Sequence, residues 1–88
     1  MVERDVQVMN AHGIHARPAA EIVKLAAKFA ANITLARDGL DVNAKSIMGV
    51  MMLAAECGST VHVKAEGADA AAALDALSAL IASRFGES

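Results

Sequence analysis

Hydrophobic residues follow two different spacings along this chain, and the change from one spacing to the other limits the folds that it can adopt. Over residues 2–9 and 61–65, apolar and polar residues alternate, which is typical of a β-strand with one buried face. Over residues 16–29 and 70–81, apolar residues recur every three or four positions, which is typical of an amphipathic helix. The sequence therefore predicts both strands and helices, each with one face to bury.

Residues 33–37 and 40–43 are predicted to form a hairpin of two further strands. Asp38 and Gly39 lie between them, and both residue types tolerate the positive φ angles of a two-residue turn. With a short apolar helix before the last strand, the order is β-α-β-β-α-β-α. This order predicts an open-faced α+β sandwich, in which a four-stranded antiparallel sheet carries three helices on one face. We expect residues 1–88 to form a single domain, since 88 residues suffice for one domain and not for two.

Residues that favour helix ends mark where the three helices begin and stop. Pro18 lies within the first turn of the first helix, where a missing N–H costs little. Ser46 precedes the short helix and Asp69 precedes the last helix, and both residue types are good N-caps. Arg84 is expected in the last turn of the final helix, with Gly86 just beyond it.

Composition argues against several classes of function. The formal net charge is −2 and neither Trp nor Tyr is present, so we expect no nucleic-acid binding. No apolar run approaches the roughly 18 residues needed to cross a membrane, and the charged N-terminus lacks the apolar stretch of a secretory signal, so no membrane insertion is expected. The single cysteine, Cys57, cannot form an internal disulfide, which favours a reducing, cytoplasmic location.

The segment from Gly13 to Ala20 combines three features that suit phosphoryl transfer. His15 lies at or next to the N-cap of the first helix, and a neutral imidazole can attack phosphorus near neutral pH. The backbone N–H groups of Ala16 and Arg17 begin that helix, lack partners within it and favour an anion. Arg17 adds a planar guanidinium that matches phosphate oxygens. Such transfer depends mainly on positioning and charge stabilisation, which these residues can supply.

Each histidine also has a simpler interpretation in which it takes no part in phosphoryl transfer. His15 could merely cap the helix, with a solvated Arg17 next to it. His12 could assist His15 electrostatically, or it could be an ordinary loop residue. His62 alternates with core valines, so it should face solvent without a functional role. No second cysteine or acidic cluster completes a metal site around His12 and His15, so we expect neither a metal nor another cofactor.

The short helix expected at residues 47–53 is apolar on nearly every side, whereas one helix on a sheet can bury only one stripe. Exposed apolar patches on small domains commonly mark partner surfaces, and methionine adapts to different partners. The residues expected in the core are Val50 and Leu53, and those expected to dock partners are Ile47, Met48 and Met51.

Two motifs resemble one protein family, and the resemblance extends over essentially the whole chain. Gly-Ile-His-Ala-Arg-Pro-Ala at 13–19 resembles the active-site signature of the HPr phosphocarriers, and Lys-Ser-Ile-Met-Gly-Val-Met at 45–51 resembles the family's regulatory-serine segment. The resemblance implies a carrier rather than an enzyme. In this family, enzyme I, charged by phosphoenolpyruvate, phosphorylates the residue matching His15 on Nδ1. Arg17 would steady the phosphoryl group, which then passes to a sugar-specific enzyme IIA domain.

The resemblance leaves the regulation and the branch of the family open. HPr kinase/phosphorylase would modify Ser46, although N-capping alone would explain a serine there. One alternative is an NPr-type phosphocarrier of the nitrogen-related phosphotransferase system. His12, where many members have a small polar residue, and Ala54, where glycine is common, do not decide between these branches. Another alternative is a regulatory interaction module that acts through Ser46, but such modules typically lack the active-site histidine. A monomer is expected, because transfer requires the site to be free for partners.

Overall fold

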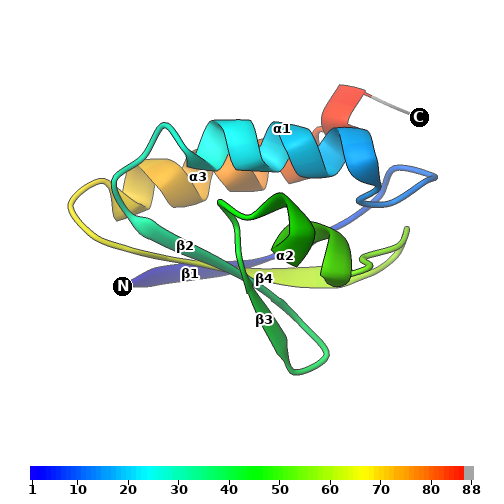
Figure 1. Cartoon of the computed structure of the whole chain (residues 1–88), viewed down its shortest axis with the longest axis horizontal. Coiled ribbons are helices and arrows are strands. Elements are labelled where there is room, and N and C mark those ends of the chain that lie inside the picture. The colour runs from blue at the N-terminus through cyan, green and yellow to red at the C-terminus, as the bar shows by residue number, and fades with distance from the viewer. Residues whose placement is uncertain (87–88) are drawn as a thin grey trace.

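The computed structural model describes residues 1–86, and in it four strands form one antiparallel sheet with the order β1-β4-β2-β3. Helices α1 and α3 lie side by side over one face of this sheet, and α2 lies next to α1 (Figure 1). The elements are β1 (Val2–Gln7), α1 (Ala16–Ala26), β2 (Asn32–Arg37), β3 (Leu40–Asn43), α2 (Ile47–Met52), β4 (Thr60–Glu66), α3 (Ala70–Ala82) and a 3₁₀ turn, η1 (Arg84–Gly86). The predicted α+β open-faced sandwich is therefore confirmed. Within residues 1–86, none of the helices combines the length and hydropathy needed to span a membrane.

The covered face of the sheet packs against the helices through aliphatic side chains. Val61 and Val63 of β4 are fully buried, and Val6 of β1 pairs with Val61 across the ladder. The helices contribute the buried residues Ala19, Ile22 and Ala26 from α1, and Ala70, Ala73, Leu74, Leu77 and Ile81 from α3. Full burial of a valine, leucine or isoleucine stabilises the fold by about 1.5–3 kcal/mol. The alternation that predicts the sheet therefore also supplies the surface to which the helices attach.

Two local predictions are confirmed at the edges of this core. Asp38 and Gly39 connect β2 to β3 with φ angles of 51° and 84°, as a two-residue hairpin requires. Ser46 is the N-cap of α2, and its hydroxyl accepts a hydrogen bond from the N–H of Gly49 at 3.1 Å. The hairpin turn and the start of the short helix therefore lie where the sequence predicts them.

The first strand and the first helix are both shorter than predicted. β1 ends at Gln7, although Val8 beyond it is fully buried and its N–H donates to the carbonyl of Ser59 at 2.9 Å. α1 ends at Ala26, so Phe29, predicted as part of the helical stripe, lies in the following turn. The N–H of Phe29 donates to the carbonyl of Ala26 at 3.1 Å, in an i to i−3 bond that tightens the end of the helix. Phe29 still packs against the core from this turn.

Asp69 occupies the N-cap position of α3, but the expectation that its side chain caps the helix is wrong. Its carboxylate instead accepts hydrogen bonds from the N–H groups of Ala30 at 2.9 Å and Ala31 at 2.8 Å, in the connection between α1 and β2. The backbone N–H of Ala30, and then that of Ala31, lowers the pKa of Asp69 below its ordinary value. Lys45 holds the same connection through a 2.7 Å hydrogen bond from Nζ to the carbonyl of Phe29.

The end of α3 also differs from the prediction. The helix ends at Ala82, so Arg84 lies in the 3₁₀ turn and not in the last helical turn. Arg84, Phe85 and Gly86 have φ angles of 61°, 54° and 73°, which reverse the chain. This reversal buries the ring of Phe85 in the core, and that burial is the physical reason for the early end of the helix.

Candidate functional site

His15 is the N-cap residue of α1 and has an extended backbone, with φ −95° and ψ −165°. Its carbonyl accepts the N–H of Ala19 at 2.9 Å, so the backbone of His15 begins the helix. Within residues 1–86, its half-buried imidazole makes no capping hydrogen bond to the first turn. The structure therefore places His15 at the N-cap position of α1, where the sequence predicts it.

The loop before His15 is held against a second loop, which contains Ala55 and Glu56. The N–H of Ile14 donates to the carbonyl of Ala55 at 2.8 Å, and the side chain of Ile14 is buried. Gly13 has a φ angle of 64°, and a Cβ at this position would lie 2.4 Å from the carbonyl oxygen of Ala55. Asn10 is buried and donates from Nδ2 to the carbonyl of Gly13 at 2.7 Å. Only glycine fits this approach, so Gly13 fixes how closely the His15 loop lies on its neighbour.

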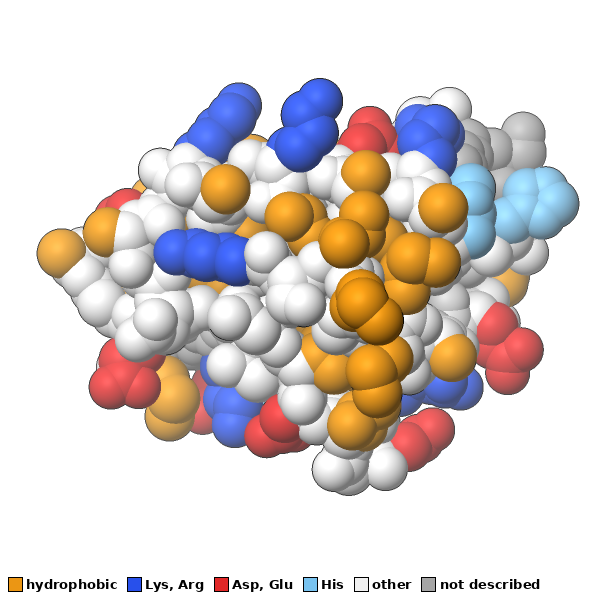
Figure 2. Space-filling view, in the orientation of Figure 1, with side chains coloured by type: hydrophobic (Ala, Val, Ile, Leu, Met, Phe, Trp, Pro, Cys, Tyr) orange, Lys and Arg blue, Asp and Glu red, His pale blue; other side chains and the backbone are white. Residues whose placement is uncertain are grey.

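His12 lies next to His15 in space as well as in sequence. The two ring centroids are 5.9 Å apart and the rings are nearly perpendicular, at 88°. His12 is exposed. Figure 2 shows the histidine side chains of this view gathered at one end of the molecule. An electrostatic influence of His12 on His15 is therefore geometrically feasible.

Arg17 lies one residue into α1 and its side chain is about half exposed. Its Nη1 donates to Oε2 of Glu21 at 3.0 Å, and its Nη2 donates to the carbonyl of Phe85 at 3.3 Å. Figure 1 shows the C-terminal turn beside the first turn of α1. These two contacts keep the guanidinium at the end of the helix that carries His15.

The backbone of Ala16 and Arg17 forms the first turn of α1, where the N–H groups have no acceptor within the helix. The first turn of the helix contains no acidic residue. Both residues are exposed. The positive end of the helix dipole, these N–H groups and the guanidinium of Arg17 together provide a positively polarised surface beside His15.

An exposed apolar surface lies on α2. Val50 and Leu53 are buried, as predicted, whereas Met48 is 72% exposed. We call the exposed residues the α2 patch, and its members are Ile47, Met48, Met51 and Met52. Met52 is an addition that the sequence did not assign. Figure 2 shows hydrophobic side chains gathered on the face where α2 and α1 lie in Figure 1.

A family model described as "PTS HPr component phosphorylation site" matches residues 2–83 of the chain. The chain belongs to the HPr family. It is 52% identical to the phosphocarrier protein HPr of Cupriavidus necator over 87 residues, which cover 99% of this chain and 98% of the relative. HPr proteins are phosphocarriers of the phosphotransferase system and not catalytic enzymes.

Solved HPr structures agree with this fold. A crystal structure of HPr-C-His from Thermoanaerobacter tengcongensis superposes with a TM-score of 0.96 at 46% identity, covering 100% of this chain and 99% of that one. A crystal structure of an HPr dimer from the same organism superposes with a TM-score of 0.79 at 47% identity, covering 99% of this chain and 100% of that one. Both superpositions thus cover essentially the whole chain, and the second is with an HPr that was crystallised as a dimer.

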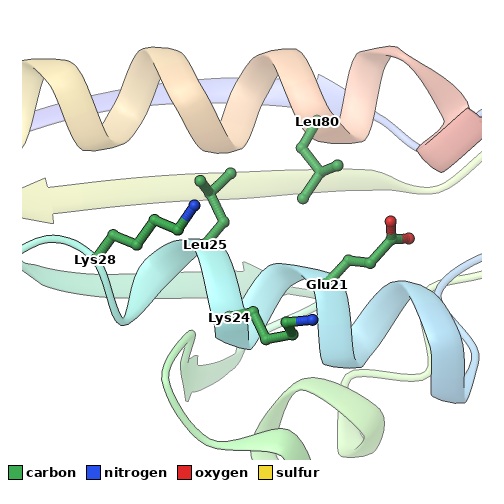
Figure 3. A pocket seen from close by; sticks show the side chains of 5 residues that line it. All are labelled: Glu21, Lys24, Leu25, Lys28 and Leu80. Atoms are coloured by element: carbon green, nitrogen blue, oxygen red, sulfur yellow. The ribbon is translucent and has the colours of Figure 1, made fainter.

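Two other features lie away from the HPr motif. A groove of about 270 Å³ lies between α1 and α3, and the residues that line it are Glu21, Lys24, Leu25, Lys28 and Leu80 (Figure 3). His62 lies on the uncovered face of the sheet, as predicted. Within residues 1–86, no three His, Cys, Asp or Glu side chains are grouped as metal ligands.

Three residues that shape the site were missed by the sequence analysis: Asn10, Glu21 and Phe85. Glu21 follows Arg17 by four positions, and opposite charges at that helical spacing could have indicated the pair. The side-chain amide of Asn10 binds a nearby backbone carbonyl. Phe85 takes part through its own backbone carbonyl, which accepts from Arg17. Hydrophobic periodicity contains no signal for either contact.

Proposed function

We propose that this chain accepts a phosphoryl group from enzyme I on His15 and passes it to enzyme IIA domains in sugar uptake. The observation that carries the proposal is the position of His15 at the N-terminus of α1, next to the Arg17 guanidinium. A family model named for a phosphorylation site spans this motif, which supports the same assignment.

The transfer is a substitution at phosphorus. As a bond forms between phosphorus and Nδ1 of the neutral His15 imidazole, the bond from phosphorus to enzyme I breaks and its electron pair stays with enzyme I. The N–H groups of Ala16 and Arg17 then stabilise the charge on the phosphoryl oxygens. Passage to an enzyme IIA domain is the same exchange with that domain as the acceptor.

Arg17 has a specific part in this step. A phosphoryl dianion is a stronger acceptor for a guanidinium than a backbone carbonyl. We therefore expect Arg17 to leave the carbonyl of Phe85, and to loosen its pair with Glu21, when His15 is phosphorylated. His12, with its ring centroid 5.9 Å away, would add favourable charge when it is protonated.

The α2 patch is the proposed docking surface for both enzyme I and the enzyme IIA domains. Its methionines are exposed, and α2 packs beside the helix that carries the transfer site. Flexible thioether side chains can adapt to several different partners. This property suits a carrier that must bind its donor and its acceptors in turn.

We also propose that HPr kinase/phosphorylase modifies Ser46. Its hydroxyl already accepts the N–H of Gly49 at 3.1 Å, and Ile47 and Met48 of the α2 patch follow directly. A phosphate there would place negative charge against the docking surface and reduce transfer at His15 by impairing docking. Phosphorylation of Ser46→Asp by enzyme I at limiting concentration tests this, since an unchanged rate would contradict it.

The proposed function also has consequences for the oligomeric state and the cellular location of the chain. We propose a monomer in solution, because the transfer site must be accessible to each partner. Light scattering during gel filtration measures the oligomeric state directly, and a dimer at low micromolar concentration would contradict the proposed monomer.

A cytoplasmic location agrees with Cys57, an exposed free thiol that is typical of reducing compartments.

The decisive experiment incubates the purified chain with phosphoenolpyruvate and enzyme I and follows its intact mass. We expect one acid-labile, alkali-stable phosphoryl group, which is absent from His15→Ala. The same assay with the enzyme I of the nitrogen-related system, followed by each enzyme IIA, distinguishes a sugar-system HPr from an NPr-type carrier. No modification by either enzyme I would reject the phosphocarrier role and favour an interaction module that acts through Ser46.

A further inference from the structure

Arg37 lies at the end of β2 and its guanidinium reaches the C-terminal end of α2. Its Nη1 donates hydrogen bonds to the carbonyl oxygens of Leu53 at 3.2 Å and Ala54 at 2.9 Å. The last carbonyls of a helix receive no N–H donor from within it, so they accept hydrogen bonds from an outside donor or from water. The Arg37 side chain is only 23% exposed, and carboxylate oxygens of Asp38 and Glu56 lie 3.6 and 3.7 Å from it. This mostly buried cation therefore caps α2.

The backbone that Arg37 holds is in an unfavourable conformation. Ala54 has a φ angle of 51°, in the left-handed region that favours glycine. A non-glycine residue remains there only when its surroundings stabilise that conformation. The two hydrogen bonds from Arg37 to the carbonyls of Leu53 and Ala54 supply such stabilisation.

The segment after Ala54 is the surface on which the His15 loop rests. The carbonyl of Ala55 accepts the N–H of Ile14 at 2.8 Å, and the same carbonyl lies against Gly13. Further along, the N–H of Gly58 donates to the carbonyl of Val8 at 2.7 Å. A change in the backbone at Ala54 would therefore be transmitted through Ala55 to the residues that precede His15.

We propose that Arg37 is a positioning residue for His15: by fixing the carbonyls of Leu53 and Ala54, it sets the place of Ala55 and hence of the Gly13-Ile14 segment. This inference rests on the proposed function, since its kinetic consequence concerns phosphoryl transfer at His15. Within residues 1–86, the polar partners of Arg37 are Leu53, Ala54, Asp38 and Glu56, and His15 is not among them. Arg37 acts only through the second loop.

The test uses variants that separate the hydrogen bonds of Arg37 from its packing. Arg37→Met keeps an apolar stem and removes the donors, whereas Arg37→Lys keeps a cationic donor. Ala54→Gly removes the strain at that position, so the double variant Arg37→Met with Ala54→Gly is expected to recover the loop. The matched control is Arg4→Met, because Arg4 makes a 3.0 Å ion pair with Asp75 away from both loops.

Two measurements are made on each variant below its unfolding temperature. The first is the rate constant of phosphorylation by enzyme I at saturating concentration, where docking is complete. We expect Arg37→Met to lose about tenfold, since a misplacement near 1 Å can cost about a hundredfold. Arg37→Lys should retain most of the rate, the double variant should recover it, and Arg4→Met should not change it. The second is hydrogen exchange of the Ile14 amide, which should become faster in Arg37→Met alone.

The outcomes separate this inference from the proposed function. An unmodified wild type rejects the proposed function, while Ile14 exchange still reports whether Arg37 holds the loop. A phosphorylated wild type together with an unchanged rate and unchanged Ile14 exchange in Arg37→Met overturns the inference. A loss confined to the KM for enzyme I, or one that Ala54→Gly does not repair, also overturns it. If Arg37→Met does not fold, Arg37→Gln, which also lacks the guanidinium, takes its place and is judged by the same criteria.

Discussion

The guanidinium of Arg17 donates a hydrogen bond to the backbone carbonyl of Phe85 at 3.3 Å, although 68 positions separate the two residues. The contact exists because residues 84–86 have positive φ angles, which turn the chain back after α3. The same turn buries the Phe85 ring. One local reversal thus completes the core and supplies an acceptor to the side chain that we propose to hold the phosphoryl group.

Replacement of Phe85 should therefore reduce the stability of the folded chain. We expect Phe85→Ala to lower the free energy of unfolding by about 3 kcal/mol, at the low end for phenylalanine because a turn near the chain end can relax. Urea denaturation measures this loss. Phe29→Ala is the matched control, since Phe29 is only partly buried and should cost less. Equal losses in the two variants would contradict the importance of the C-terminal turn.

Gly13 and Gly39 allow the steric role of the His15 loop to be isolated. Both have positive φ, but a Cβ at Gly13 would meet Ala55 at 2.4 Å, whereas one at Gly39 would meet nothing within 4 Å. Gly39→Ala should cost about 1–2 kcal/mol from its backbone alone and leave phosphorylation unchanged. Gly13→Ala should cost more and slow phosphorylation of His15 by about tenfold.

The two glycine variants are compared by two measurements on the same samples. Stopped-flow kinetics with enzyme I gives the phosphorylation rate, and urea denaturation gives the free energy of unfolding. If Gly13→Ala behaves as Gly39→Ala does in both measurements, the close approach of Gly13 to Ala55 has no effect on the site.

Features that depend on neighbours in sequence could be predicted. The alternation of Val61, Val63 and Ala65 predicts one buried face of β4 because successive side chains of a strand point to opposite faces. The hairpin at Asp38 and Gly39 follows from φ preferences. Since the anion-favouring end of α1 depends only on where a helix begins, the motif at His15 could also be located from sequence.

Features that depend on distant backbone groups could not be predicted. Asp69 has the right residue type for an N-cap, yet its carboxylate binds the N–H groups of Ala30 and Ala31, which only the packing of α1 and α3 brings near. The acceptor of Arg17 is likewise a carbonyl at Phe85. Every residue has a carbonyl and nearly every residue an N–H, so sequence gives no means of choosing among them.

His62 should give the folded chain a pH-dependent stability. Its Nδ1 lies 2.5 Å from Oδ1 of Asp5 and its Nε2 lies 2.5 Å from Oε1 of Glu3. The hydrogen bond with Asp5, and then that with Glu3, raises the pKa of His62 above the ordinary value of 6.5. A raised pKa in the folded state means that the added stability is complete below the unfolded pKa and is lost as pH rises through the folded pKa.

Urea midpoints between about pH 6 and pH 9 therefore test this cluster. We expect the wild type to lose stability over that range and His62→Gln to lose less, because glutamine does not titrate. The two profiles should converge at the alkaline end. A wild-type profile that is parallel to that of His62→Gln would contradict a role for protonated His62 in joining β1 to β4.

The α2 patch predicts a separation between docking and stability. Met48 is 72% exposed, so Met48→Asp should change the free energy of unfolding by no more than about 0.5 kcal/mol. The same change places a charge in an apolar interface, where desolvation of that charge opposes binding. We expect the KM for enzyme I to rise about tenfold or more, while the rate constant at saturation stays within about twofold, because the residues around His15 are untouched.

The matched control is Leu40→Asp, since Leu40 is a 40% exposed apolar residue on β3. If Leu40→Asp raises the KM as much as Met48→Asp does, the α2 patch is not the docking surface. If Met48→Asp lowers only the rate constant, α2 contributes to the transfer step and not to docking.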